Sequence, residues 1–190
     1  MVLKKEILSA DPAIYFYRNY LSSDLCDQFI KQFSCKAKRS EVTDGNIGSL
    51  NEQRTSSTTF IENSDFIGEQ LKIKLSKDLK WDLVALEKIQ FTSYSLGEKY
   101  SPHFDAFDHG IIGDKKKQRL YTSIIYLNDD FKGGHTIFPK LDISVKPEKG
   151  AMLLFSNCIN STIFLNPFML HGSTPIEFGK KNILTTWLLS

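Results

Sequence analysis

The sequence predicts a mainly β protein with helices in its first third, built as an antiparallel sandwich or a closed barrel. Amphipathic stripes with helical spacing occur before Trp81, and short apolar segments rich in β-branched and aromatic residues follow it. Turn-prone residues separate these segments, so a parallel α/β sheet is not expected. The length of 190 residues fits one domain, 1–190. We expect residues 1–80 to form a helical N-terminal part with a mobile loop, and residues 81–190 a β-rich half.

Two helices are expected in the N-terminal part. Ser22 or Ser23 can cap the first, whose apolar side carries Leu25, Phe29 and Phe33. The second begins near Ser64 and has a stripe at four-residue spacing that packs on a sheet: Ile67, Leu71, Leu75 and Leu79. Between them, the polar stretch from Ser34 to Ser57 predicts a mobile loop.

Five segments are predicted to be strands because they are apolar and bounded by turn residues. They are Leu83 to Tyr94, Tyr121 to Leu127, Ala151 to Phe155, Thr162 to Leu165, and Ile183 to Leu189.

Composition argues against several classes of function. The formal net charge is +2 and lysines and acids are interspersed along most of the chain, which gives no argument for nucleic-acid binding. No apolar run reaches membrane-spanning length, and no apolar segment follows Lys4 and Lys5, so neither a membrane span nor a secretory signal is expected. We therefore expect a cytoplasmic protein. Three cysteines without a C-x-x-C pair argue against a disulfide framework and a zinc knuckle.

The segment His103-Phe104-Asp105 carries an imidazole and a carboxylate two residues apart. In an extended strand both would point to the same side and could reach one ion. His171, at the end of an apolar run, is the best candidate for a third ligand. Two histidines and one carboxylate suit iron(II) oxygenases, which need open metal positions. A lone His-x-Asp is more often a surface pair, so the interpretation depends on the segment after His171.

That segment ends in a strand on which Lys181, Ile183, Thr185 and Trp187 share one face. A lysine facing the inside of a small barrel would be costly unless it met an anion, such as a dicarboxylate co-substrate. Alternatively, Lys181 lies at the exposed start of the strand and extends to water. The spacing favours neither alternative.

Several segments, in order, resemble the prolyl 4-hydroxylase branch of the iron(II)/2-oxoglutarate dioxygenases. The similarity runs from Glu87 to Trp187. It includes the segment from Gln90 to Asp105, the strand led by Arg119, the Gly-Gly-x-Thr-x-Phe-Pro turn at Gly133, the Pro-x-x-Gly strand from Pro147 to Phe155, and the His171, Gly172, Pro175, Gly179 and Lys181 motif. Asn19 to Ser22 and Arg54 to Ser56 are weaker landmarks. The ordered set is far more specific than any one motif.

The resemblance implies a double-stranded β-helix (a cupin-like jelly roll) with N-terminal helices packed on one sheet. It implies a hydroxylase that uses Fe(2+), 2-oxoglutarate and O2, with ascorbate as reductant, and releases succinate and CO2. His103, Asp105 and His171 would bind iron, and Lys181 would pair with the far carboxylate of 2-oxoglutarate, assisted by Tyr94 and Thr136. The positions that match the peptide-substrate side are Glu87, Tyr100, Arg119 and Trp187. The expected substrate is a prolyl residue of a peptide or protein, which would be proline-rich.

Three features depart from the family pattern and leave the substrate open. Asn182 replaces an aromatic residue, His135 occupies a usually acidic or small position, and Asp114 to Gln118 form a lysine-rich loop. The alternatives are the same chemistry on a free amino acid or another small molecule, and a non-catalytic jelly-roll peptide-binding module. A zinc hydrolase is a weaker alternative, since His and Asp also bind zinc but no His-Glu-x-x-His motif is present.

Overall fold

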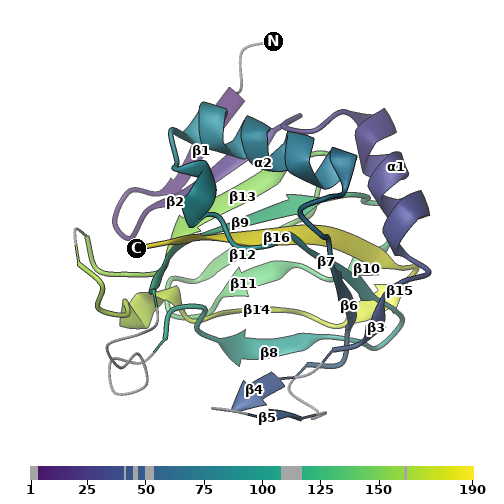
Figure 1. The fold of residues 1–190 in the computed structure, drawn as a ribbon. Coiled ribbons are helices and arrows are strands. Elements are labelled where there is room, and N and C mark those ends of the chain that lie inside the picture. The colour runs from purple at the N-terminus through teal and green to yellow at the C-terminus, as the bar shows by residue number, and fades with distance from the viewer. Residues whose placement is uncertain (1–3, 41, 45–46, 50–53, 108–116, 161) are drawn as a thin grey trace.

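The computed structural model describes residues 4–190 except 41, 45–46, 50–53, 108–116 and 161. Two antiparallel sheets dominate it (Figure 1). The major sheet has eight strands in the order β1 (Lys4–Ser9), β2 (Ile14–Arg18), β13 (Met152–Ser156), β9 (Arg119–Tyr126), β16 (Lys181–Leu189), β7 (Gln90–Tyr94), β6 (Ser57–Phe60) and β3 (Lys38–Arg39). The minor sheet has four, in the order β12 (Ile143–Val145), β11 (Thr136–Phe138), β14 (His171–Ser173) and β8 (Tyr100–His103).

Smaller elements complete the fold. Two two-stranded sheets pair β10 (Lys132–Gly133) with β15 (Ile176–Phe178), and β4 (Val42–Asp44) with β5 (Ile47–Ser49). The short 3-10 helices are η1 (Leu83–Ala85) and η3 (Pro167–Met169). Among the described residues, no helix combines the length and apolar character that crossing a bilayer requires.

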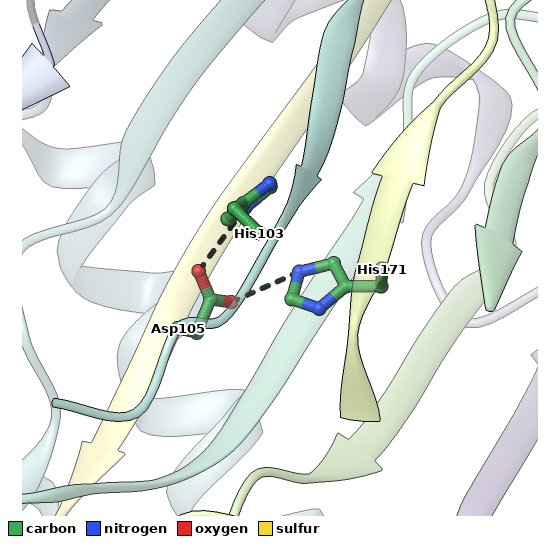
Figure 2. Close-up of side chains that lie close together, drawn as sticks. All are labelled: His103, Asp105 and His171. Carbon is green, nitrogen blue, oxygen red and sulfur yellow. Dashed lines mark ion pairs between the residues drawn. The ribbon is translucent and has the colours of Figure 1, made fainter. Parts of the chain in front are cut away.

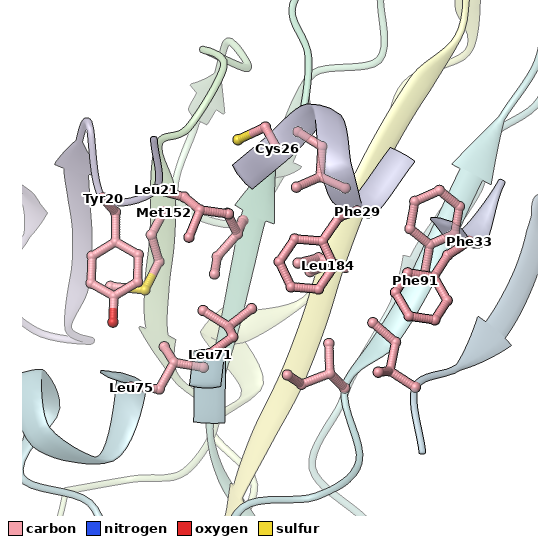
Figure 3. Close-up of a cluster of buried hydrophobic side chains, with 14 of the residues drawn as sticks. Tyr20, Leu21, Cys26, Phe29, Phe33, Leu71, Leu75, Phe91, Met152 and Leu184 are labelled. Carbon is pink, nitrogen blue, oxygen red and sulfur yellow. The ribbon is translucent and has the colours of Figure 1, made fainter. Parts of the chain in front are cut away.

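The major sheet separates two hydrophobic clusters because alternate side chains of each strand point to opposite faces. On one face, Leu184 and Met152 pack against residues of both helices, including Phe29, Leu71 and Leu75 (Figure 3). On the other face, the second cluster lies between the two sheets and contains Ile183, Leu153, Phe155, Tyr94, Tyr126, Phe138 and Val145. The face of β16 that carries Lys181, Ile183, Thr185 and Trp187 therefore points to the inside of the barrel.

Both predicted helices are confirmed, and they cover the outer face of the major sheet (Figure 1). Helix α1 (Ser23–Phe33) is capped by Ser22, whose hydroxyl accepts from the Leu25 amide. Helix α2 (Phe66–Leu79) is capped by Asp65, whose carboxylate accepts from the Gly68 amide, so it begins two residues later than the serine suggested. Both bury the stripes expected from the sequence.

Two predicted strands need correction. In the segment from Leu83 to Tyr94, only Gln90–Tyr94 is a strand, because Asp82 caps the 3-10 turn η1 through the Val84 amide. The predicted strand from Thr162 to Leu165 is wrong. There the Thr162 hydroxyl donates to the Ile159 carbonyl and accepts from the Phe164 amide. Such local side-chain bonds favour a turn over a ladder, and only Leu165 forms an isolated bridge, with Cys158.

The N-terminal part is less helical than expected. Strands β1, β2, β3 and β6 all join the major sheet. The predicted mobile loop from Ser34 to Ser57 contains β3, β4 and β5, and its residues 41, 45–46 and 50–53 lie outside the described residues. Most of the lysine-rich loop, residues 114–116, also lies outside them. The mainly β architecture with helices packed on one sheet is confirmed.

Candidate metal centre

Three side chains, carried by two neighbouring strands of the minor sheet and the segment just after one of them, meet between the sheets. His103 ends β8, Asp105 follows it by two residues, and His171 begins β14. The two strands are antiparallel, and His103 and His171 are paired across them. One ligand atom from each of the three residues lies within 4.8 Å of the others. Figure 2 shows the carboxylate of Asp105 lying between the two imidazole rings.

The backbone sets the orientation of both rings. Nδ1 of His103 lies 2.9 Å from the carbonyl oxygen of Ser101, and Nδ1 of His171 lies 2.9 Å from that of Met169. A carbonyl oxygen only accepts, so each Nδ1 carries a hydrogen and donates. Each Nε2 is then directed at Asp105, at 3.5 Å from Oδ1 for His103 and from Oδ2 for His171. This arrangement is typical of metal-binding histidines, whose second nitrogen donates to the protein.

The charge states of the cluster also suit a cation. Burial raises the pKa of Asp105, but the interactions with His171 and His103 outweigh it and hold that pKa well below its usual range. Burial and the neighbouring His171 lower the pKa of His103. At neutral pH, Asp105 is therefore a carboxylate and His103 a neutral imidazole whose Nε2 offers a lone pair. Two nitrogens and one carboxylate oxygen are a donor set that suits iron(II) with open positions.

Aromatic rings surround the cluster. Tyr100 stacks on His103 with ring centroids 3.6 Å apart. On the other side, the ring centroids of Phe155 and Phe138 lie 4.7 and 5.8 Å from that of His171. The side chain of His171 is only 4% exposed, whereas that of His103 is 22% exposed. The cluster is thus shielded on the β14 side and accessible on the β8 side.

Lys181 is buried inside the barrel at 1% exposure, so the alternative that it extends to water is wrong. Its ammonium donates to the carbonyl oxygen of Gly134 at 2.6 Å and to the hydroxyl of Ser173 at 3.0 Å. Burial lowers its pKa to about 7. Ser173 shares a face of β14 with His171, two residues away, which is about 7 Å along a strand. A single short molecule can therefore reach both the ammonium and the metal cluster.

Three further side chains line the space around this ammonium. The rings of Tyr94 and Tyr126 have their centroids 5.3 and 5.7 Å from Nζ. The hydroxyls of Tyr126 and Thr136 lie 2.8 Å apart. Tyr94 and Thr136 were expected here. Tyr126 was not predicted from the sequence. Its side chain lies on the same face of β9 as that of Ile124, and it pairs with Ile183, which lies on the same face of β16 as Lys181.

The residues expected on the substrate side also come together. The guanidinium of Arg119 donates to both carboxylate oxygens of Glu87, at 2.7 and 2.9 Å, and lies 3.8 Å from the centroid of the Trp187 ring. Tyr100 lies between the metal cluster and a second guanidinium, that of Arg54, which is 4.9 Å from its ring. Each predicted site residue therefore lies in one of three adjoining groups, around the metal cluster, around Lys181 and around Arg119.

Comparisons with known proteins agree with this geometry. Residues 89–189 match the 2OG-Fe(II) oxygenase superfamily. Probable prolyl 4-hydroxylase 7 of Arabidopsis thaliana is 34% identical over an alignment of 206 positions, gaps included, which covers 95% of this chain and 64% of that protein. Prolyl 4-hydroxylase 2 of the same plant is 32% identical over 212 aligned positions, which cover 97% of this chain and 70% of that protein. The chain therefore spans about two thirds of the length of these relatives.

A solved structure gives the same result. The viral collagen prolyl hydroxylase vCPH from Paramecium Bursaria Chlorella virus-1, in its 2OG complex, superimposes with a TM-score of 0.76 at 25% identity. The match covers 93% of this chain and 96% of that one. The likeness confirms the double-stranded β-helix expected from the sequence.

Proposed function

Because the chain belongs to the 2OG-Fe(II) oxygenase superfamily, and to its prolyl 4-hydroxylase-like members, we propose that it hydroxylates a prolyl residue of a peptide or protein. His103, Asp105 and His171 hold iron(II), and Lys181 holds 2-oxoglutarate. The observation that carries the proposal is the convergence of two imidazole Nε2 atoms and one carboxylate within 4.8 Å.

The metal supplies the oxidising chemistry when bound, together with 2-oxoglutarate and O2, and the co-products are succinate and CO2. The chain supplies the ligands and a dry space beside them. The carbonyls of Ser101 and Met169 keep both Nε2 lone pairs turned inward. The rings of Phe138 and Phe155 shield the cluster on the β14 side, and the β8 side stays accessible.

Lys181 binds the far carboxylate of 2-oxoglutarate in this proposal. Its two present acceptors, the Gly134 carbonyl and the Ser173 hydroxyl, are neutral, and burial of an ammonium without a counter-charge is costly. A carboxylate would supply that charge. The hydroxyls of Tyr126 and Thr136 lie 2.8 Å apart, and the Tyr94 ring centroid lies 5.3 Å from Nζ. These three side chains would donate their hydroxyl hydrogens to the same group.

The peptide side of the site is formed by Glu87, Tyr100, Arg119 and Trp187. Glu87 holds the guanidinium of Arg119 over the indole ring of Trp187. The remaining N–H groups of Arg119 would then donate to a peptide carbonyl. Names of the plant and viral relatives support a prolyl substrate. The same chemistry on a free amino acid or another small molecule is the second candidate.

Hydroxylation of a proline-rich peptide tests the proposal. We expect the protein, incubated with iron(II), 2-oxoglutarate and ascorbate as reductant in air, to release succinate and to add one oxygen atom to the peptide. Mass spectrometry and amino-acid analysis would locate that atom on proline. Free L-proline serves as the matched small substrate and should gain no oxygen.

Each contrary result has its own meaning. Oxygen added to free proline but not to the peptide would favour the small-molecule alternative. Absence of succinate with every substrate, in protein that binds neither metal nor 2-oxoglutarate, would favour a non-catalytic peptide-binding module. Reactions without iron(II) and with an added chelator give the background for succinate release and for oxygen addition.

Replacing Arg119 with lysine should impair peptide binding and leave 2-oxoglutarate binding unchanged. Lysine cannot form the bidentate pair with Glu87 or stack on Trp187. Loss of one charge-assisted pair costs on the order of 1.5–3 kcal/mol, so we expect the KM for peptide to rise roughly tenfold or more. Steady-state kinetics with each substrate varied in turn would measure this. Arg18→Lys, whose partners Glu6 and Glu148 are surface residues, is the control. An unchanged peptide KM in Arg119→Lys would remove Arg119 from the peptide site.

A further inference from the structure

A chain of buried hydrogen bonds reaches the candidate metal centre from behind Asp105. The Thr122 hydroxyl lies 2.7 Å from Oδ2 of Asp105, and the side-chain amide of Asn157 lies 2.8 Å from the same hydroxyl. Thr122 is 0% exposed and Asn157 is 2% exposed. Both side chains are covered by protein atoms, and their hydrogen bonds toward the metal centre run through Asp105.

The chemistry of the three side chains determines which atom donates in each of these hydrogen bonds. A carboxylate only accepts, so the single hydroxyl hydrogen of Thr122 points to Asp105. The Thr122 oxygen must then accept, and Asn157 must present its NH2 group rather than its carbonyl oxygen. That carbonyl oxygen has no partner among the described residues. Leaving that oxygen unpaired costs free energy, and the hydrogen bond from the Asn157 NH2 group to the Thr122 hydroxyl offsets part of this cost.

Both residues are anchored by the backbone. Thr122 lies in the middle of β9, paired with Trp187 of β16 and Phe155 of β13. Asn157 follows β13, and its backbone N–H donates to the Leu120 carbonyl while its carbonyl accepts from the Asn166 amide. Asp105, in contrast, lies just beyond the end of β8, outside any strand. Asp105 therefore has no ladder of its own, and its carboxylate is held by hydrogen bonds from side chains anchored on β9 and just after β13.

We propose that Thr122 and Asn157 are positioning residues that fix the rotation of the Asp105 carboxylate, so that it faces the two imidazoles before a metal arrives. This inference rests on the proposed function, because it assigns the metal to His103, Asp105 and His171. A carboxylate held in its binding orientation loses less conformational freedom on ligation. Partners of this kind change metal affinity by about 10- to 100-fold in other metal sites.

Metal titration tests the proposal without relying on turnover. Cobalt(II) chloride, added to the metal-free protein of residues 1–190 under anaerobic conditions, gives a visible absorption spectrum that reports both affinity and ligand geometry. We expect Thr122→Val, which keeps the shape but removes the hydroxyl, to weaken cobalt(II) binding about tenfold and to alter the spectrum. Thr122→Ser, which restores the hydroxyl, should bind within about threefold of the parent.

Thr186→Val is the matched control. Thr186 is a buried threonine on the adjacent strand, and its hydroxyl donates to the Glu87 backbone carbonyl on the helix-covered side of the sheet. It should bind cobalt(II) like the parent. Parental affinity in Thr122→Val, weakening in Thr186→Val equal to that in Thr122→Val, or failure of Thr122→Ser to restore binding would each overturn the proposal.

If Thr122→Val does not fold, Asn157→Ala keeps the test open. It leaves the hydroxyl in place and removes only its donor, so we expect a smaller loss of affinity, and parental affinity would overturn the role of Asn157. A parent protein that binds no cobalt(II), or binds it equally well after His171→Ala, would instead overturn the proposed function, so the two failures are distinguishable.

Discussion

Asp105→Ala is expected to reduce succinate release to the background of metal-free protein. The substitution removes the only carboxylate of the cluster and leaves two imidazoles, of which that of His103 is neutral at neutral pH because burial and the neighbouring His171 lower its pKa. Two imidazole nitrogens alone hold iron(II) weakly compared with a ligand set that includes a carboxylate. Succinate release and cobalt(II) titration should fail together, and His103→Ala and His171→Ala should behave in the same way.

Asp27→Ala is a suitable control for this prediction. Asp27 is an exposed carboxylate that pairs with Lys149 on the surface, and surface pairs contribute little to stability. It should retain parental turnover and metal affinity. An Asp105→Ala protein that still makes succinate at the parental rate would show that the metal does not bind at this cluster.

The sequence predicts the fold class correctly, and its local spacing also suggests part of the candidate site. His103 and Asp105 are two residues apart, and this spacing alone suggests that they can reach one ion. The pairing of His171 with His103 across β8 and β14 is a long-range contact, and no local pattern specifies it. The resemblance to the prolyl 4-hydroxylase family indicated that His171 joins this cluster, because several family motifs occur in the same order and at the same spacing along the chain. Lys181 shows the same limit, since its parity could not decide between the barrel interior and an exposed strand start.

Residues that act through other residues escape the sequence altogether. Thr122 is 17 positions from Asp105, and Asn157 is 35 positions from Thr122. Threonine and asparagine in and beside apolar strands usually indicate packing and turns, so nothing marks these two. Strands β1 and β2 were missed for a different reason. Their partners lie at the other end of the chain, with β2 paired to β13, and β propensity depends on such context.

Replacing Lys181 with methionine should weaken 2-oxoglutarate binding strongly and leave metal affinity near the parental value. Methionine fills a similar volume without the charge. Loss of a buried charge-assisted pair costs on the order of 1.5–3 kcal/mol, or roughly 10- to 150-fold in affinity. Anaerobic calorimetric titration of 2-oxoglutarate into cobalt(II)-loaded protein would measure it. An unchanged dissociation constant would remove Lys181 from the co-substrate site.

The pKa of Lys181 adds a pH dependence with a defined sign. Burial lowers that pKa from its ordinary value of 10.5 to about 7 in the protein without co-substrate. The unfolded chain therefore binds one more proton than the folded chain between those two pH values. Stability contributed by this group is lowest below pH 7 and rises as the pH increases from about 7 towards 10.5. Chemical denaturation of the parent and of Lys181→Met at several pH values would isolate this contribution as the difference between them.

Affinity for 2-oxoglutarate should change with pH in the opposite direction. The bound carboxylate requires the ammonium, so above about pH 7 the site must take up a proton on binding, and the affinity should fall as the pH rises from about 7 to 9. Lys181→Arg stays protonated throughout this range and should lose the slope, whereas Lys181→Met should bind weakly at every pH. A parent protein whose affinity is constant between about pH 6 and 9 would contradict the lowered pKa. Burial penalises the ammonium in the empty site and a carboxylate relieves that penalty, so one proton accounts for both opposing trends.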